Sequence, residues 1–336
     1  EMSSNQISYY ITRYFTDYIP KQRSYSRNTL LSYRDTFVLL LTFYRDKLHI
    51  QPEKLIYKDF STENIEKFLS WMEETRDISA STRNQRLAAV HSFFRYVQLK
   101  EPAAFEQCGR VLSVPYKRVP IVPMNYLTID GIRFLLSQPN QACASELRDM
   151  SIMMLLYETA ARVQELLDLT PASIQYNSTT VVELHGKGNK TRLVPLNTEA
   201  TGIIKNYIRR CERQDISKPL FVNRKGEKLT RAGVQYIIDK HISMARNDRP
   251  DMFKSKITSH CFRHSKAMHL LEAGVNLIYI RDFLGHSSVT TTEIYAKTYH
   301  KIKAEQFMKN SAIVETKKRY SKDQKDDLIK WMKKNL

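Results

Sequence analysis

The stretch from Ser259 to Tyr295 constrains this chain more than any other, because it places reactive side chains at fixed helical spacing. His260 and Arg263 are three residues apart, so a helix presents both side chains from one face. His286 follows in a second segment, and Tyr295 lies nine residues after it. We therefore expect a short helical hairpin that presents two imidazoles, a guanidinium and a phenol.

Glycine and N-cap residues mark the turns within this stretch. Gly274 predicts the C-terminal end of the first helix, and a second helix follows it. Ser287, Ser288 and the threonines at 290–292 are N-cap residues ahead of a last helix that carries Tyr295.

These side chains suit an anionic substrate. A guanidinium holds phosphate oxygens with paired donors, and an imidazole donates a hydrogen bond or moves a proton near neutral pH. A tyrosine can be a covalent nucleophile. Each part alone also has a structural interpretation, since the chain contains 19 tyrosines and helix surfaces carry His-x-x-Arg pairs by chance. The ordered combination is much harder to obtain by chance.

That combination, HCFRH…LGHSSVTTTEIY, resembles the C-terminal signature of the tyrosine recombinases, the integrase and Xer-like superfamily. The resemblance implies a catalytic set that includes His260, Arg263, His286 and Tyr295, with Tyr295 as the nucleophile. It also implies DNA strand transfer through a 3′-phosphotyrosine without metal or ATP. No cofactor is expected.

An arginine in the middle of the chain adds to the resemblance. Arg162 follows the apolar run 153–156, in what we expect to be one helix from about Glu146 to Leu169. A guanidinium there needs an anionic ligand or a carboxylate, and Glu165 lies one turn further on. A structural Arg–Glu pair is the alternative. The resemblance implies that Arg162 is the first catalytic arginine and Glu165 its supporting acid, although Ala160 replaces the family's usual glycine.

The clearest β signal follows that arginine. Two β-rich runs, Thr179 to Leu184 and Thr191 to Pro195, flank a Gly-Lys-Gly-Asn-Lys turn and predict a hairpin. Alone, this is an ordinary charged turn. The resemblance implies that Lys187 protonates the leaving 5′ oxygen of DNA, and that Lys190 and Arg192 contact the DNA backbone.

Residues 1–100 show helical periodicity almost throughout. Apolar residues recur at three- and four-residue spacing in the segments 7–18, 29–47, 63–75 and 79–99. We expect Asn28 and Thr62 to cap two of these helices. The pattern of basic and aromatic residues in the last segment resembles the core-binding domain of the recombinases, so we expect residues 1–100 to form this helical DNA-binding domain. A solvated basic face is the alternative. Its candidates for DNA contact are Arg83, Arg86 and Arg95.

Prolines then divide the chain. Four of them, with Lys117 and Arg118 as further candidates for DNA contact, make residues 101–125 an extended basic linker. We expect the catalytic domain at 126–312 and a tail with a docking helix at 313–336. Within the catalytic domain, Arg231 opens a helix and is either a DNA contact or a solvated side chain.

Composition supports a polyanionic partner. The chain has 53 Lys+Arg against 35 Asp+Glu, a formal net charge of +18, which favours nucleic acid. Its four cysteines are scattered without a Cys-x-x-Cys pair, which argues against disulfides and zinc sites. No apolar run is long enough to span a membrane. We expect a cytoplasmic protein that is associated with the bacterial nucleoid when bound to DNA.

Taken together, these features predict a mainly α protein with a small β-hairpin or sheet (α+β), built as a two-domain C-shaped DNA clamp. The expected function is site-specific recombination through a Holliday junction, in a tetramer that exchanges C-terminal helices. Docking of that helix within one subunit, and the need for partner recombinase subunits, remain open. A type IB topoisomerase and a non-catalytic DNA-binding regulator are alternatives, whereas a two-metal nuclease would need clustered carboxylates that the chain lacks. The basic tail favours an integrase or transposase of a mobile element over dimer resolution.

Overall fold

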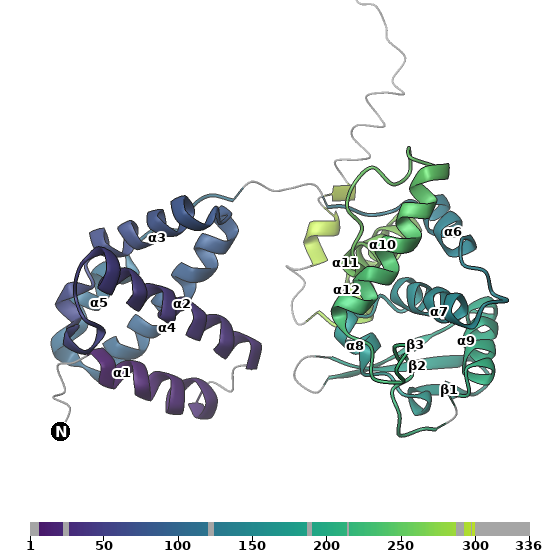
Figure 1. Cartoon of the computed structure of the whole chain (residues 1–336), viewed down its shortest axis with the longest axis horizontal. Helices are drawn as coiled ribbons and strands as arrows, with labels where there is room; N and C mark the ends of the chain where they lie inside the picture. Colours follow the sequence, from purple (N-terminus) through teal and green to yellow (C-terminus); the bar gives the residue numbers. More distant parts are fainter. Residues whose placement is uncertain are drawn as a thin grey trace, which may run out of the picture. The chain divides into compact units, whose positions relative to one another are not determined.

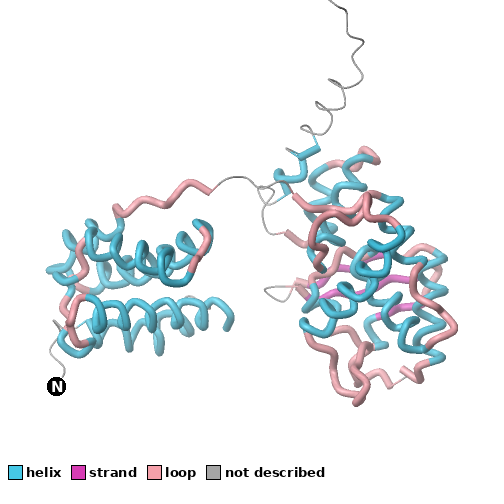
Figure 2. Tube along the Cα trace, turned by 45° about the horizontal axis from the view of Figure 1, so that its top comes forward, coloured by secondary structure: helices cyan, strands magenta, loops and turns pink. Residues whose placement is uncertain are grey.

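The computed structural model describes residues 7–22, 27–119, 124–186, 190–213, 215–286, 292–296 and 298–299. Backbone contacts divide the chain into two compact units, Glu1–Val122 and Pro123–Leu336. Helices predominate in both units, and the second unit also contains one small sheet (Figures 1 and 2), as the sequence predicts. Among the described residues, no helix has the length and apolar character needed to cross a membrane.

The first unit packs its helices around an aromatic core in which Phe93 contacts Tyr14 and Phe37, with ring centroids 5.2 and 4.9 Å apart. Ser61 and Ser79 cap two helices by accepting backbone N–H bonds. The predicted caps at Asn28 and Thr62 are wrong, because both residues lie inside their helices. The helical segments are α1 (Ile7–Arg13), a π-helix (Tyr14–Gln22), α2 (Arg27–Lys47), α3 (Thr62–Arg76), α4 (Ala80–Lys100) and α5 (Phe105–Leu112).

The region expected as a linker begins with helix. Pro102 opens a 3₁₀ turn, Pro102–Ala104, that leads directly into α5. Proline is tolerated in the first turn of a helix, where its missing N–H has no partner to lose. Cys108 and Val111 of α5 are buried in the core of the first unit. The prediction of an extended chain from residue 101 is therefore wrong for this part, and within the described residues the extended segment begins near Val114.

The second unit surrounds its core with helices on a three-stranded antiparallel sheet of order β1-β2-β3. The predicted hairpin is β2–β3, with Val182 paired to Val194. The helix α11 lies against α7, α10 and α12 (Figure 1). The elements are α6 (Ile129–Ser137), α7 (Ala144–Glu158), α8 (Val163–Leu167), β1 (Ile174–Tyr176), β2 (Thr180–His185), β3 (Thr191–Pro195), α9 (Thr198–Arg210), α10 (Arg231–Asp248), α11 (Ser259–Glu272) and α12 (Leu277–Leu284).

A sharp turn separates α7 from α8, so the prediction of one helix from 146 to 169 is wrong. Ala160 has a left-handed backbone conformation with φ +47°, and the Oγ1 of Thr159 accepts from the backbone N–H of Ala161 at 3.3 Å. An alanine in this conformation costs about 1–2 kcal/mol relative to the right-handed one. The left-handed turn therefore forms with alanine instead of glycine, and it ends the helical path of α7 just before Arg162.

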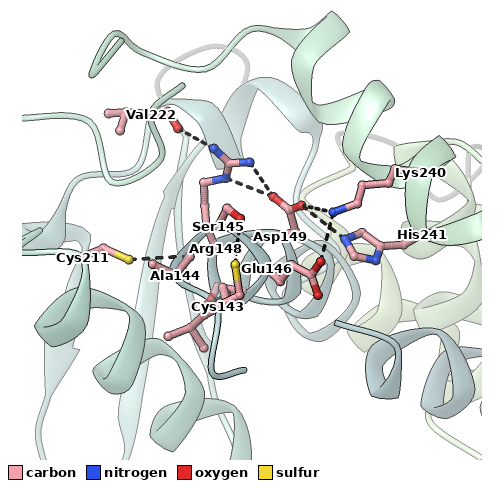
Figure 3. A network of polar contacts seen from close by, with 12 residues as sticks. Cys143, Ala144, Ser145, Glu146, Arg148, Asp149, Cys211, Val222, Lys240 and His241 are labelled. Atoms are coloured by element: carbon pink, nitrogen blue, oxygen red, sulfur yellow. Dashed lines mark hydrogen bonds and ion pairs between the residues drawn. The ribbon is translucent and has the colours of Figure 1, made fainter. Parts of the chain in front are cut away.

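A buried ionic network joins α7 to α10 (Figure 3). Asp149 is 2% exposed; its Oδ1 accepts from Arg148 at 2.7 Å, and its Oδ2 lies 3.2 Å from Nε2 of the fully buried His241. Lys240 adds a contact to Asp149 at 3.7 Å. Burial raises the pKa of Asp149, but the hydrogen bonds from His241 and Arg148 outweigh it and hold the pKa below its ordinary value. Asp149 is therefore a charged anchor between the two helices.

Replacing Asp149 by asparagine keeps the size of the side chain but removes the charge that Arg148 and Lys240 share. We expect a loss of about 3–5 kcal/mol in the free energy of unfolding, as for other broken buried ion pairs. Urea unfolding followed by circular dichroism measures it. The matched control is Asp251→Asn, whose exposed carboxylate pairs with Arg249 at 3.2 Å in full contact with water and should contribute far less. Equal losses in the two variants would contradict an anchoring role.

Candidate active site

Arg263 of α11 is a buried cation between two neutral acceptors. Only 3% of it is exposed, and its Nη1 and Nη2 donate to the carbonyl oxygens of Ala160 and Leu284, each at 2.6 Å. Burial and the nearby Arg162 guanidinium lower the pKa of Arg263 to about 10. Within the described residues no carboxylate forms an ion pair with it. A buried positive charge without a counter-charge makes this site ready to accept an anion.

Arg162 lies at the start of α8, directly after the Ala160 turn. Its backbone N–H and its Nη1 donate to the two carboxylate oxygens of Glu165, at 2.9 and 2.7 Å. The Nη2 reaches the carbonyl oxygen of Gly285 at 3.4 Å. About a third of the side chain, 34%, remains exposed. Glu165 thus fixes the position of the guanidinium, whose exposed part stays accessible to a ligand.

Glu165 serves two arginines at once. Its Oε2 also accepts from Arg192 of β3 at 2.6 Å, and its side chain is only 4% exposed. Burial raises the pKa of Glu165, but the hydrogen bonds from Arg192 and Arg162 prevail and the pKa lies below its ordinary value. One carboxylate between two guanidiniums leaves a net positive charge. The predicted contact of Arg192 with the DNA backbone remains a prediction, whereas its ion pair within the protein was not foreseen.

Gly285 is required by its surroundings. Its φ is +63°, and a Cβ at this position would lie 3.2 Å from Nη1 of Arg192. The left-handed turn ends α12 and leads into His286, whose Nδ1 is hydrogen-bonded to Oγ1 of the buried Thr292 at 3.0 Å. Burial, followed by repulsion from Arg263 and Arg162, lowers the pKa of His286 to about 4. His286 also lines a pocket of about 190 Å³ together with Lys190 and Arg192.

Tyr295 points its hydroxyl at His264, the second histidine of the HCFRH motif, for which no role was predicted. The tyrosine is 2% exposed, and its Oη lies 3.0 Å from Nδ1 of His264. Burial raises the pKa of Tyr295, and the charges of Arg263 and Arg162 oppose the rise. His260 lies beside His264, with ring centroids 6.2 Å apart. The spacing of these two histidines, i to i+4 on one helix, was the signal that could have identified His264.

The structure brings Arg162, Glu165, His260, Arg263, His286 and Tyr295 together in the second unit. Burial of part of its ring, followed by the charges of Arg263 and Arg162, lowers the pKa of His260. Lys187 lies outside the described residues. In the part of the chain that the structure describes, no group of three or more His, Cys, Asp or Glu side chains could hold a metal ion.

Several other predicted DNA contacts have partners within the protein. Arg86 joins α4 to α2 through Ser32 and Thr36, at 3.1 and 3.0 Å. Glu73 lies 3.6 Å from Arg83 and 2.8 Å from Lys117. Arg231 donates to Gln164 at 3.1 Å. The exposed candidates are Arg95, Lys117, Arg118, Lys190 and Arg231, and contact with DNA stays a prediction for all of them.

The fold and the site together define a tyrosine recombinase, a site-specific DNA strand-transfer enzyme. Two family models match the chain: "Phage integrase family" over residues 125–301 and "Phage integrase, N-terminal SAM-like domain" over residues 12–101. The chain belongs to the phage integrase family.

Relatives in sequence agree with this membership. A Sinorhizobium fredii protein named as an integrase/recombinase, y4rC, is 34% identical over 303 residues, which cover 90% of this chain and 89% of the relative. Tyrosine recombinase XerC of Bacillus subtilis is 29% identical over 292 residues, 84% of this chain and 89% of XerC.

Solved structures of similar fold include two complexes with DNA. XerH recombinase bound to a palindromic difH substrate has a TM-score of 0.67 at 19% identity, covering 85% of this chain and 81% of XerH. The Tn1549 transposon integrase with transposon right end DNA has a TM-score of 0.64 at 19% identity, covering 90% and 99%. At these identities the likeness concerns the fold.

Glu165→Gln removes the charge that holds Arg162 and Arg192 together. We expect a loss of about 2–3 kcal/mol in the free energy of unfolding, less than the full 3–5 of a buried pair because Arg162 is partly exposed. Urea unfolding measures the loss, and the exposed Glu199→Gln is the matched control. An unchanged unfolding midpoint would show that the carboxylate does not stabilise the arginines.

Acid should destabilise the free protein through His286 and His264. Burial, followed by the charges of His260 and Arg263, lowers the pKa of His264 to about 4, as it does for His286 with its own neighbours. Unfolded histidines titrate near 6.5, so the unfolded chain binds protons first and stability falls as pH drops from about 6.5 to about 4. Histidine ring NMR, assigned with single asparagine variants, measures both pKa values. Titration of both rings near 6.5 would contradict the expectation.

Proposed function

We propose that the residues around Arg263 carry out strand cleavage and rejoining. The observation that supports this most is the buried Arg263, which has neutral hydrogen-bond acceptors and no carboxylate among the described residues, beside the partly open Arg162. Arg162, Arg263 and His286 hold the non-bridging oxygens of the scissile phosphate and stabilise the charge that develops in the pentacoordinate transition state. Glu165 and Arg192 position Arg162 from behind.

Tyr295 attacks the phosphorus, which forms a 3′-phosphotyrosine and releases the 5′ hydroxyl of the same DNA strand. Lys187 protonates that leaving oxygen. His260, whose ring centroid lies 6.2 Å from that of His264, assists proton movement at Tyr295. Because the phosphotyrosine conserves the phosphodiester energy, the reverse attack by a 5′ hydroxyl reseals the strand, and a hydroxyl from a partner duplex recombines it.

Exchange of two duplexes requires four strand cleavages. Two of them form the Holliday junction, and the other two resolve it. We propose that four subunits assemble on paired recombination sites and exchange their C-terminal segments, 313–336. Ile278 and Tyr279 of α12 support a contact surface in the second unit, since 51% and 70% of these apolar residues are exposed. Both units bind the DNA, and recombination takes place in the cytoplasm on nucleoid DNA.

We also propose that the recombination serves a mobile element, by integration, excision or transposition. The support is the similarity to y4rC and, in fold, to the Tn1549 integrase in complex with transposon end DNA. The similarity to XerC supports chromosome-dimer resolution as the second candidate.

The test uses duplexes selected from a random library by binding, each with a nick that traps the cleaved strand. We expect the wild-type chain to form an adduct with DNA that is stable to SDS, in the presence of EDTA. Tyr295→Phe should reduce the adduct below detection, because the attacking oxygen is absent. Denaturing gel electrophoresis of labelled DNA measures it.

Tyr299→Phe is the matched control and should keep the adduct. An adduct that persists in Tyr295→Phe and disappears in Tyr299→Phe would move the nucleophile to position 299. Relaxation of supercoiled plasmid without a selected site would favour the topoisomerase alternative.

A further inference from the structure

The hydroxyl of Tyr295 has one hydrogen-bond partner among the described residues, and it is a nitrogen base. Nδ1 of His264 lies 3.0 Å from the phenolic oxygen, with the two rings tilted at 56° and their centroids 5.7 Å apart. Both residues belong to packed elements, since His264 is on α11 and Tyr295 is buried in a small cluster with Ala267 and Leu284. The geometry is that of a nucleophile and its base.

We propose that His264 is the general base for Tyr295, a role that rests on the proposed function. As the phenolic oxygen bonds to phosphorus, its proton passes to Nδ1 of His264, and the bond from phosphorus to the 5′ oxygen breaks. The leaving oxygen takes its proton from Lys187. In the rejoining step, the imidazolium of His264 returns its proton to the phenolate oxygen as that oxygen leaves phosphorus.

The neighbours of His264 fit this assignment. Arg263 cannot take the proton, because its guanidinium has a pKa of about 10, is already protonated at pH 7 and has no acceptor atom. In the free protein burial, followed by repulsion from His260 and Arg263 of the same helix, lowers the pKa of His264 to about 4, so its imidazole is neutral at pH 7. His286 lies close enough that a positive charge on His264 lowers the pKa of His286. A phosphate bound to the arginines adds a negative charge that favours the imidazolium.

The variant His264→Asn distinguishes two roles of His264, that of a general base and that of a hydrogen-bond acceptor only. An asparagine oxygen can accept the phenolic hydrogen bond in place of Nδ1, but it does not take up the proton. On the nicked duplex, at saturating DNA, we expect the rate of adduct formation to fall about 10²–10⁴-fold with unchanged DNA affinity. His49→Asn is the matched control at an exposed histidine with φ +56°, which asparagine tolerates, and should keep the wild-type rate.

A chemical rescue tests the same role within one variant. His264→Gly leaves space for free imidazole, which should raise the rate of adduct formation in proportion to its concentration. Rescue does not depend on how the variant compares with wild type in folding. Absence of rescue, together with a His264→Asn rate within about threefold of wild type, would overturn the proposal.

A changed leaving group shows whether His264 acts on the proton of Tyr295 or on that of the leaving 5′ oxygen. A duplex with a 5′-bridging sulfur at the scissile phosphate needs no acid, because a thiolate leaves readily. It should restore cleavage by Lys187→Ala but not by His264→Asn. Restoration of both variants would place His264 at the leaving oxygen and overturn the proposal, whereas a wild-type chain that binds selected DNA without any adduct would overturn the proposed function itself.

Discussion

The site depends on the two hydrogen bonds that Arg263 donates to backbone carbonyls. One acceptor is Ala160, in the turn between α7 and α8, and the other is Leu284, at the end of α12. Segments more than a hundred residues apart in the chain are therefore fixed around one guanidinium. The turn sets the position of Arg162, and the end of α12 sets that of His286, so the anchoring of Arg263 positions the other groups as well.

Such an arrangement is unfavourable in isolation, because a buried cation lacks its hydration. Two carbonyl dipoles compensate only in part, which agrees with the lowered pKa of Arg263. Arg162, unlike Arg263, has a carboxylate partner. Glu165 forms ion pairs with both Arg162 and Arg192 and neutralises one of their two positive charges. The site keeps a net positive charge without an exposed carboxylate that would repel phosphate. Electrostatic preorganisation of this kind is ordinarily the largest part of transition-state stabilisation.

The sequence predicted the helical character, the hairpin and the residues of the motif, because local periodicity and short-range spacing encode them. It failed where tertiary contacts decide. The helix break at Ala160 depends on a left-handed backbone conformation, which the sequence does not indicate because the residue is not glycine. The helix α5 was not predicted because Pro102 indicated an extended chain, whereas this proline lies in the first turn of the helical segment. The contact of Thr292 with His286 and the sharing of Glu165 by Arg192 join separate segments, so spacing could not show them. His264 was within reach of a helical-spacing argument.

The partners of Arg263 are main-chain atoms, and this has a consequence for how the sequence can diverge. A carbonyl oxygen is present whatever side chain a residue carries, so mutation at position 160 or 284 does not delete an acceptor. Only the path of the backbone must be preserved. Alanine at position 160 meets that condition at φ +47°. Substitutions at positions 160 and 284 therefore keep the hydrogen bonds of Arg263, provided that the backbone path is kept. A single substitution of Glu165, by contrast, removes the ion pair with Arg162.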